Sequence, residues 1–171
     1  DFIEQFEPPC YKIASPCLTD HGLLRHHRRL GRPLIMSTGM SDLRQVQAAV
    51  DVVGTQDLIL LHCTSTYPSA VAELNLRRIA TLAQHFPVPV GYSGHEVGLA
   101  TTYAAAALGA RVIERHLTLD RAMWGSDQAA SVEPHGMRRL VRDIREFDAA
   151  LGSAEIRLLE SEVPVMRKLR R

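Results

Sequence analysis

The sequence predicts an α/β fold of parallel strands and helices, corresponding to about the last five βα units of an incomplete (β/α)8 barrel. Short apolar segments alternate with amphipathic helical segments five times along the 171 residues, which is the pattern of a parallel sheet. Polar residues cluster at the C-terminal end of every predicted strand. No GxGxxG or phosphate-binding loop motif occurs, so the sequence gives no support to a nucleotide-binding open sheet.

The first two units each pair a short apolar strand with a capped helix. The first strand is expected at residues 11–15, and Thr19 or Asp20 is expected to cap a helix that Gly31 ends. The second strand is expected at 33–38, and Ser41 is expected to cap the next helix. The apolar residues of that helix share one face: Leu43, Val46, Ala49, Val50 and Val53.

The next two units repeat this pattern. Residues 58–62 read as a strand buried on both faces. Asn75 is expected to cap the helix that follows, whose inner face is Leu76, Ile79, Ala80, Ala83 and Phe86. The fourth strand is expected at 88–92, and Gly109 is expected to end a helix of small residues at 101–108.

The fifth unit contains the longest helix. Its strand is expected at 111–115, followed by a loop of about fifteen residues, a length that is often functional. Pro134 then lies near the first turn of a helix that Gly152 ends. The inner stripe of this helix is Met137, Leu140, Val141, Ile144, Phe147 and Leu151. Residues 1–152 are therefore assigned to the C-terminal part of a barrel domain, and residues 153–171 to a linker.

Five units also fit a flavodoxin-like open sheet, for which about 150–170 residues suffice, whereas a complete eightfold barrel needs about 250. The strand ends favour the barrel. In an open sheet only the strands beside the switch point share a site, but in a barrel every strand end faces one mouth. Here all five ends carry polar side chains.

The composition excludes several classes of protein. The net charge of +1 gives no electrostatic footprint for nucleic acid, and no apolar run is long enough to span a bilayer. The three cysteines are odd in number and lack the spacing of a disulfide framework. Together with the absence of a signal peptide, they predict a reducing, cytoplasmic location.

Two histidines follow successive strands. His95 and His116 each lie just past a strand end, where together they could bind one metal ion and leave positions open for substrate. A single histidine is more often a capping or hydrogen-bonded residue, so only the pair favours metal binding. Glu114 is ambiguous, because strand alternation directs it away from the neighbours of His116 and an arginine could pair with it.

A phosphate is the ligand best suited to the other strand ends. Lys12 supplies a cation, Ser15, Ser37 and Ser93 supply hydroxyl donors, and Gly39 allows close approach of the backbone. Each serine alone is more often a helix or turn cap.

The loops after the third and fifth strands carry further candidates. Ser65 and Tyr67 follow the third strand; Tyr67 could offer its phenol to a polar ligand or simply pack in its loop. Asp127 lies in the long final loop, and Trp124 is a lid or a plug.

Several segments, in this order along the chain, resemble the N-acetylneuraminate (sialic acid) synthase family. They are KIAS (12–15), MSTGM (36–40), LHCTSTYP (61–68), NLRRI (75–79), PVGYSGHE (89–96), IERHLTLD (113–120) and WGSDQAASVEP (124–134). The resemblance implies a TIM barrel followed by an antifreeze-like domain. It also implies condensation of phosphoenolpyruvate with N-acetylmannosamine or a related acetamido-sugar, with a divalent metal, usually Mn²⁺.

The resemblance also assigns roles to residues. It implies that His95 and His116 bind the metal, that Lys12, Ser15, Ser37 and Ser93 hold phosphoenolpyruvate, and that Tyr67 and Asp127 lie near the sugar. Ser65 is a further substrate-binding candidate, and it stands where some relatives have Asn. The full-length protein is expected to be a homodimer in which the antifreeze-like domain caps the partner's site.

The chain departs from the family pattern in two further places. Ser15-Pro16-Cys17 lacks an acidic residue that many relatives carry after the first strand, and Gly94 replaces an Asp seen in others. The first three barrel units are also missing, so this chain alone is expected to be inactive. Two alternatives remain: another phosphoenolpyruvate-dependent aldol-type sugar-acid synthase, or a non-catalytic barrel that binds a sugar phosphate.

Overall fold

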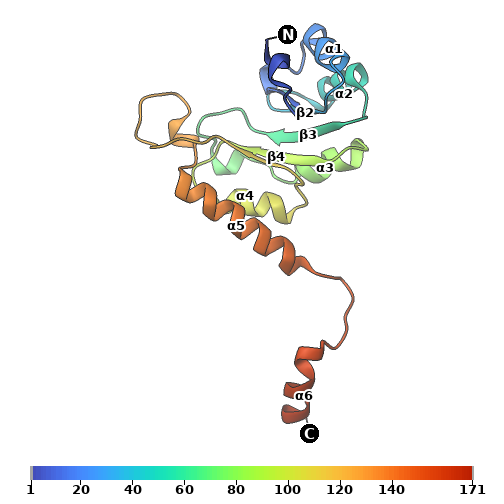
Figure 1. The fold of residues 1–171 in the computed structure, drawn as a ribbon, viewed down its shortest axis with the longest axis vertical. Coiled ribbons are helices and arrows are strands. Elements are labelled where there is room, and N and C mark those ends of the chain that lie inside the picture. Colours follow the sequence, from blue (N-terminus) through green and yellow to red (C-terminus); the bar gives the residue numbers. More distant parts are fainter. Residues whose placement is uncertain (1, 171) are drawn as a thin grey trace.

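The computed structural model describes residues 2–170 and contains one curved sheet of five parallel strands (Figure 1). The strands lie in the order β1-β2-β3-β4-β5, and each pairs in parallel with the next. Their bounds are β1 Tyr11–Ile13, β2 Leu34–Ser37, β3 Leu58–Cys63, β4 Val90–Gly94 and β5 Ile113–Arg115. All five strands were predicted, and the observed strands are mostly shorter than the predicted segments.

A helix follows every strand. These helices are α1 His21–Arg29, α2 Leu43–Val53, α3 Arg78–His85, α4 Ala100–Ala107 and α5 Pro134–Leu151. Short 3₁₀ turns occur at Ile3–Phe6, Ser15–Cys17, Val71–Glu73, Gln128–Ala130 and Glu160–Glu162. Strand followed by helix, repeated with a sequential strand order, is the connectivity of a (β/α) barrel, whereas a doubly wound open sheet reverses its strand order at a switch point.

An ion pair between the two edge strands shows how strongly the sheet curves. Lys12 of β1 and Glu114 of β5 approach to 3.6 Å between Nζ and Oε1. In a flat sheet of this size the edge strands would lie about 19 Å apart, which is four strand spacings of about 4.8 Å. Two side chains could not bridge that distance. The sheet is therefore part of a barrel wall, and the predicted incomplete barrel is confirmed.

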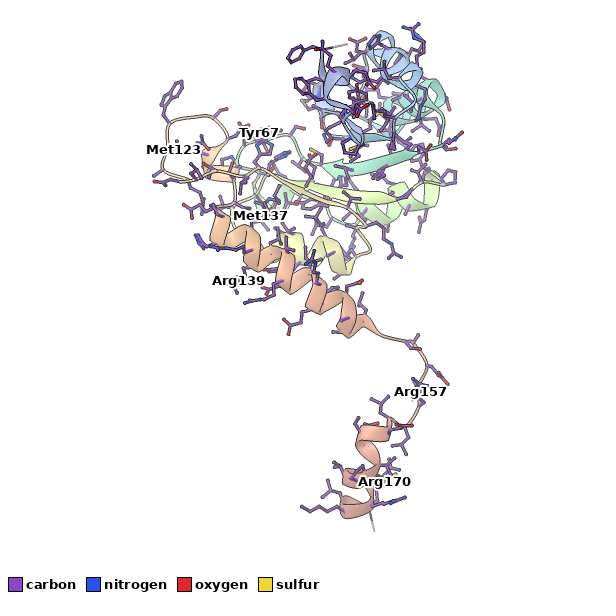
Figure 2. The ribbon with its side chains drawn as sticks, viewed as in Figure 1. Tyr67, Met123, Met137, Arg139, Arg157 and Arg170 are labelled. Atoms are coloured by element: carbon purple, nitrogen blue, oxygen red, sulfur yellow. The ribbon has the colours of Figure 1, made fainter. Side chains whose placement is uncertain are left out.

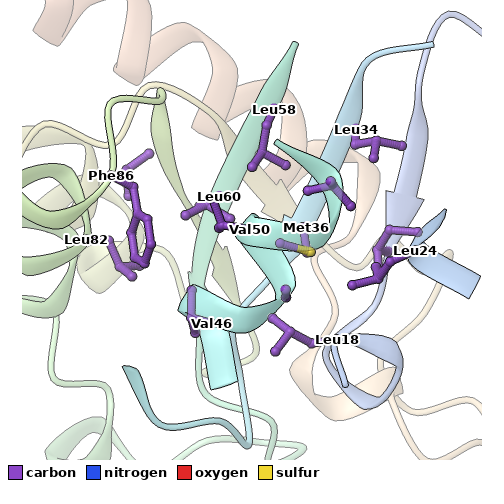
Figure 3. Packing of buried hydrophobic residues seen from close by; sticks show 14 of the residues in the cluster. Leu18, Leu24, Leu34, Met36, Val46, Val50, Leu58, Leu60, Leu82 and Phe86 are labelled. Atoms are coloured by element: carbon purple, nitrogen blue, oxygen red, sulfur yellow. The ribbon is translucent and has the colours of Figure 1, made fainter. Parts of the chain in front are cut away.

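The hydrophobic core lies between the outer face of this wall and the helices. Leu34, Met36, Leu58 and Leu60 of the strands pack against Val46 and Val50 of α2, with Leu24 of α1 nearby (Figure 3). Because side chains alternate along a strand, the inner face carries the other set: Lys12, Ile35, Ser37, Leu61, Cys63 and Ser93. The polar members of this set lie toward one end of the wall.

Two predicted helix caps are wrong. Asp42, not Ser41, caps α2: its carboxylate accepts from the Gln45 N–H at 2.9 Å, and the Gln45 side chain accepts from the Asp42 N–H. A carboxylate with a glutamine three residues later forms the stronger, reciprocal cap. Asn75 has a φ of 47° and lies before α3, which begins at Arg78. Asp20, one of the two residues predicted to cap α1, does cap it.

The segment expected to be a linker contains a further helix, α6 Val163–Leu169. Figure 1 shows α6 apart from the barrel wall, and Arg157 and Arg170 mark this segment in Figure 2. Nearly all of its side chains are exposed. Its local sequence explains the helix, because Pro164 occupies the first turn and basic residues lie in the last turn. Within residues 2–170, no helix is both long and apolar enough to cross a bilayer.

Candidate active site

The predicted site residues gather at the carboxyl edge, which is the end of the wall where β1–β5 terminate. Tyr67 follows β3, and the loop that carries Met123 lies at the same end of the molecule (Figure 2). Each strand delivers its polar groups there because all five strands run in parallel.

Three rings form the centre of the site. The rings of His95 and His116 meet edge to face with centroids 5.0 Å apart. Tyr67 lies beside both, with its ring centroid 4.2 Å from that of His95 and 5.6 Å from that of His116. His95 is buried, while Tyr67 is 42% exposed. The structure therefore brings together the two histidines that the sequence predicts as a pair, with the predicted tyrosine against them.

One nitrogen of each histidine already has an acceptor. Nδ1 of His95 lies 2.8 Å from the Thr64 carbonyl oxygen, and Nδ1 of His116 lies 3.3 Å from Oδ2 of Asp127. Metal-binding histidines usually donate their second nitrogen in this way, to a carbonyl or a carboxylate. In each ring Nε2 is the nitrogen left for a metal. The residue types and their partners thus fit a divalent ion.

The protein would supply few of the ligands of such an ion. Among the residues that the structure describes, no group of three or more His, Cys, Asp and Glu side chains is arranged to hold a metal. Such an ion would have these two imidazoles as its ligands from the described residues, and its other coordination positions would be open. An open coordination sphere is the arrangement of catalytic metal sites rather than structural ones.

A thiol lies beside His95. Cys63 Sγ is 3.8 Å from Nδ1 of His95, 3.5 Å from Oγ of Ser15 and 3.6 Å from Oγ of Ser65. Burial raises the pKa of Cys63, but hydrogen bonds from His95 and the two serines outweigh burial, and the net shift is downward. Burial lowers the pKa of His95, but its bonds to Cys63 and Thr64 outweigh burial, and the net shift is upward.

Hydroxyl groups and one cation form the second part of the site. Oγ of Ser93 donates to Oε1 of Glu114 at 2.7 Å, and the same carboxylate pairs with Lys12. The buried Oγ of Ser37 makes no hydrogen bond within the described residues. Buried polar atoms are nearly always paired, so this hydroxyl is a group available to a ligand. Ser15 Oγ accepts from the Gly39 N–H at 3.1 Å, so the backbone at Gly39 lies against the hydroxyls of the site, and its close approach to a phosphate stays a prediction.

Two residues of the site were not predicted. Cys63 was treated only as a free thiol, although its alternation with Leu61 places it on the inner face of β3. Glu114 was left ambiguous, with an arginine as its expected partner. The structure pairs it with Lys12 instead and directs it into the site. The barrel's curvature produces that pairing, and local alternation along β5 does not reveal it.

This geometry defines a barrel-type α/β protein with a histidine pair, a lysine and several serine hydroxyls at the carboxyl edge. The NeuB family model matches residues 1–156. The chain therefore belongs to the NeuB family, as the resemblance in its sequence motifs predicted.

Similar proteins agree with this assignment. The chain is 39% identical to N,N'-diacetyllegionaminic acid synthase of Legionella pneumophila, over all of this chain and 50% of that protein. It is 38% identical to human N-acetylneuraminate-9-phosphate synthase, over 99% of this chain and 48% of that protein. The chain thus spans about half the length of these relatives, which are sugar-acid synthases.

A solved structure shows the same likeness. The crystal structure of N-acetylneuraminic acid (sialic acid) synthetase from Leptospira borgpetersenii, in complex with citrate, superposes with a TM-score of 0.87 and is 32% identical in sequence. The match covers 98% of this chain and 61% of that chain. The five-stranded wall is therefore similar to part of a sugar-acid synthase.

Proposed function

We propose that the complete protein condenses phosphoenolpyruvate with N-acetylmannosamine or a related acetamido-sugar, giving a nonulosonic acid and phosphate. The observation that carries this proposal is the histidine pair, His95 and His116, at one edge with a lysine and the unpartnered hydroxyl of Ser37. A metal-binding pair suits a carbonyl substrate, and the cation with hydroxyls suits a phosphate. The named activities of the relatives support the same reaction class.

In this proposal the phosphate of phosphoenolpyruvate binds between Lys12 and the serines. Lys12 supplies a fixed positive charge, and Ser15, Ser37 and Ser93 supply short donors from three different segments. Ser65 contacts Cys63, which in turn contacts Ser15, so Ser65 extends this polar surface. Groups held on separate strands of one rigid wall can orient the enol carbon toward the second substrate at little entropic cost.

A divalent metal, which we propose to be Mn²⁺, would be held by His95 and His116. When bound, such an ion polarises the aldehyde of the open-chain sugar as a Lewis acid. The Thr64 carbonyl and the Asp127 carboxylate orient the two rings through their Nδ1 atoms. Tyr67, packed on His95 and partly exposed, offers a phenol at the place proposed for the sugar. In this proposal Asp127 also accepts a hydrogen bond from a sugar hydroxyl.

A cytoplasmic location forms part of the proposal. The thiols of Cys10, Cys17 and Cys63 are all free, and free thiols persist in a reducing compartment. Cys17 follows Ser15 in a 3₁₀ turn beside the site. Because this position lacks the carboxylate found in many relatives, the preferred sugar can differ from N-acetylmannosamine.

The test is phosphate release from phosphoenolpyruvate by the full-length, metal-loaded protein. Release is expected only with a 2-acetamido-sugar that has a free aldehyde, and a panel of hexosamines and diacetamido-dideoxy sugars would rank the substrates. His95→Ala and His116→Ala are expected to abolish metal-dependent release without unfolding the protein. His85→Ala, at an exposed position on α3, is the matched histidine control and should retain it.

Three results would contradict this proposal. Unchanged metal activation in the His95 and His116 variants would remove the metal role of the pair. Phosphate release with arabinose 5-phosphate, but with no acetamido-sugar, would indicate a different aldol-type synthase. Failure to release phosphate with any sugar would leave a non-catalytic barrel that binds a sugar phosphate.

A further inference from the structure

We propose that a buried ion pair, Glu96 with Arg115, is the device that fixes the two site histidines relative to each other. This inference rests on the proposed function of His95 and His116 as metal ligands. Glu96 directly follows His95, and Arg115 directly precedes His116. Glu96, Arg115 and the three hydroxyl residues bonded to Glu96, which are Tyr92, Thr101 and Thr102, together form a clasp.

The ion pair of the clasp is fully buried, and its carboxylate accepts hydrogen bonds from four side chains. The side chains of Glu96 and Arg115 are 0% and 1% exposed, and Nη1 of Arg115 lies 3.1 Å from Oε1 of Glu96. Thr101 and Thr102 donate to the same oxygen at 2.9 and 2.8 Å, and Tyr92 donates to Oε2 at 2.8 Å. Five side chains from β4, the loop after it, β5 and α4 are thereby joined in one arrangement.

Arg115 also donates to backbone carbonyl oxygens in two segments, the loop after β4 and the segment before α5. Its guanidinium donates to the carbonyls of Glu96 at 2.6 Å and Gly98 at 2.9 Å, in the loop after β4. It donates to the Ala130 carbonyl at 3.2 Å as well. Ala130 in turn donates its N–H to the Asp127 carbonyl at 3.1 Å. One side chain thus joins the loop of His95 to the segment whose Asp127 contacts His116.

The clasp lies on the α4 side of the sheet, on the face opposite to the two histidine rings. Successive side chains of an extended chain point to opposite faces, so Glu96 and Arg115 face α4 while His95 and His116 face the carboxyl edge. Glu96 and Arg115 are therefore positioning residues and not catalytic ones. Hydrogen bonds also fix the backbone of the two histidines. The His95 carbonyl accepts from the Ser69 N–H at 2.9 Å, and the His116 carbonyl accepts from the Val132 N–H at 2.8 Å.

Energetics favour a positioning role over a purely stabilising one. A buried ion pair must overcome the desolvation of both charges, and well-packed apolar residues often stabilise a protein equally well or better. What such a pair adds is a fixed direction at each partner, through bonds that have strict geometry. The site needs that property, since two ligands from different strands must keep one separation.

Gly94 makes room for the clasp. A Cβ atom at this position would lie 2.7 Å from Oε2 of Glu96 and 3.1 Å from Cδ of Arg115. Any larger residue at position 94 would therefore displace the ion pair. The inference therefore applies to chains that carry glycine at this position.

The test measures Mn²⁺ affinity of the full-length protein by electron paramagnetic resonance, which reads binding without relying on turnover. Glu96→Leu combined with Arg115→Met removes both charges and leaves no unpaired buried charge. Thr102→Val is a milder change that removes one bond to each partner, and Thr102→Ser retains both bonds. Mn²⁺ affinity is expected to fall about 10- to 100-fold in the first two variants and to stay unchanged in Thr102→Ser.

Tyr103→Phe is the matched control. Tyr103 neighbours Thr102 on α4, but its hydroxyl donates to Asp143 of α5 at 2.8 Å and does not touch the clasp. This variant should keep wild-type Mn²⁺ affinity. Phosphoenolpyruvate affinity without metal should be unchanged in all the variants, because Lys12 and the serines lie on other segments or on the opposite face.

The outcomes separate this inference from the proposed function. Wild-type Mn²⁺ affinity in the folded double variant and in Thr102→Val would overturn the clasp, while weak binding by His95→Ala and His116→Ala would still uphold the metal site. Full Mn²⁺ affinity in both histidine variants, or no Mn²⁺ binding by the wild type, would overturn the metal site and the clasp together. A parallel loss of phosphoenolpyruvate affinity would indicate general damage and would also contradict the positioning role.

Discussion

Gly39 brings the backbone after β2 against three side chains of the site. Its N–H donates to Ser15 Oγ at 3.1 Å. A Cβ atom there would lie 2.7 Å from that oxygen and 3.2 Å from Sγ of Cys63, and it would collide with Ser65 Oγ. The space between β1, β2 and β3 at the carboxyl edge is therefore filled by backbone, and only glycine fits it.

Gly39→Ala is expected to destabilise the protein by about 1–3 kcal/mol, the usual cost of overpacking a tight site, and to weaken phosphoenolpyruvate binding. Urea denaturation and a binding titration on the full-length protein would measure both effects. Gly22→Ala is the control, because Gly22 lies in α1, where alanine is the better helix former. Equal effects of the two substitutions would argue against a special role for Gly39.

Single residues were predicted well wherever strand alternation or a strand end determined their position. His95 and His116 directly follow β4 and β5, whereas Lys12 and Ser93 lie within β1 and β4 on the inner face. Contacts that depend on the curvature of the wall could not be predicted from the sequence. The Lys12–Glu114 pair joins residues about a hundred positions apart, and no local pattern marks such a pair.

At the scale of elements, β3 and the turn before α3 are joined by a buried histidine. Nε2 of His62 lies 2.6 Å from the Leu74 carbonyl oxygen. Burial lowers the pKa of His62 below the usual 6.5, and the charge of Arg78 lowers it further, although the bond to Leu74 acts in the opposite direction. His62 is therefore held in its neutral form by the fold.

This shift predicts loss of stability in mild acid. Just below pH 6.5 the unfolded chain binds a proton at His62 while the folded chain does not, so the free energy of unfolding falls as the pH falls. The slope from one such group is at most about 1.4 kcal/mol per pH unit. Urea denaturation at about pH 7.5 and pH 5.5 should show a larger loss in the wild type than in His62→Gln.

Other groups titrate over the same range, and the comparison of the two proteins removes their contribution. His95, for example, has a raised pKa, and its stabilising effect is present at low pH and lost as the pH rises. An equal loss in the wild type and in His62→Gln would show that His62 does not drive the acid sensitivity.

Elements were predicted in the correct order, but their ends were less predictable. The apolar stripes of α2 and α5 follow from helical periodicity. The start of α3 does not follow from periodicity. The chain first passes through a 3₁₀ segment at Val71–Glu73 and then through Asn75, which has a positive φ. That detour lets Leu74 reach His62, and tertiary packing of this kind leaves little trace in local sequence.

At the scale of the whole molecule, the wall has five strands, whereas a closed barrel of this type has eight. The inner face and α5 line an apolar hollow of about 370 Å³, formed mainly by Ile35, Leu61, Met137, Val141 and Ile144. In a closed barrel, further strands pair with β1 and β5 and cover the inner face.

The 171-residue chain alone is therefore expected to release no phosphate from phosphoenolpyruvate, whereas the full-length protein is expected to release it. The reason is geometric, because three further strand ends contribute to the carboxyl edge of a complete barrel. Parallel assays of the two proteins, at matched concentration and Mn²⁺, would measure this. Turnover by the isolated chain at the rate of the full-length protein would show that five units suffice.

The Lys12–Glu114 pair has a consequence for ligand selectivity. An anion that approaches Lys12 must compete with a carboxylate already tethered 3.6 Å away, whose effective concentration far exceeds that of solutes in the cell. Chloride has no directional contacts to add and is expected to displace this carboxylate poorly. A phosphate ester that also engaged the serine hydroxyls, as proposed above, would displace it more readily. The pair is therefore expected to act as an internal competitor that discriminates against small anions.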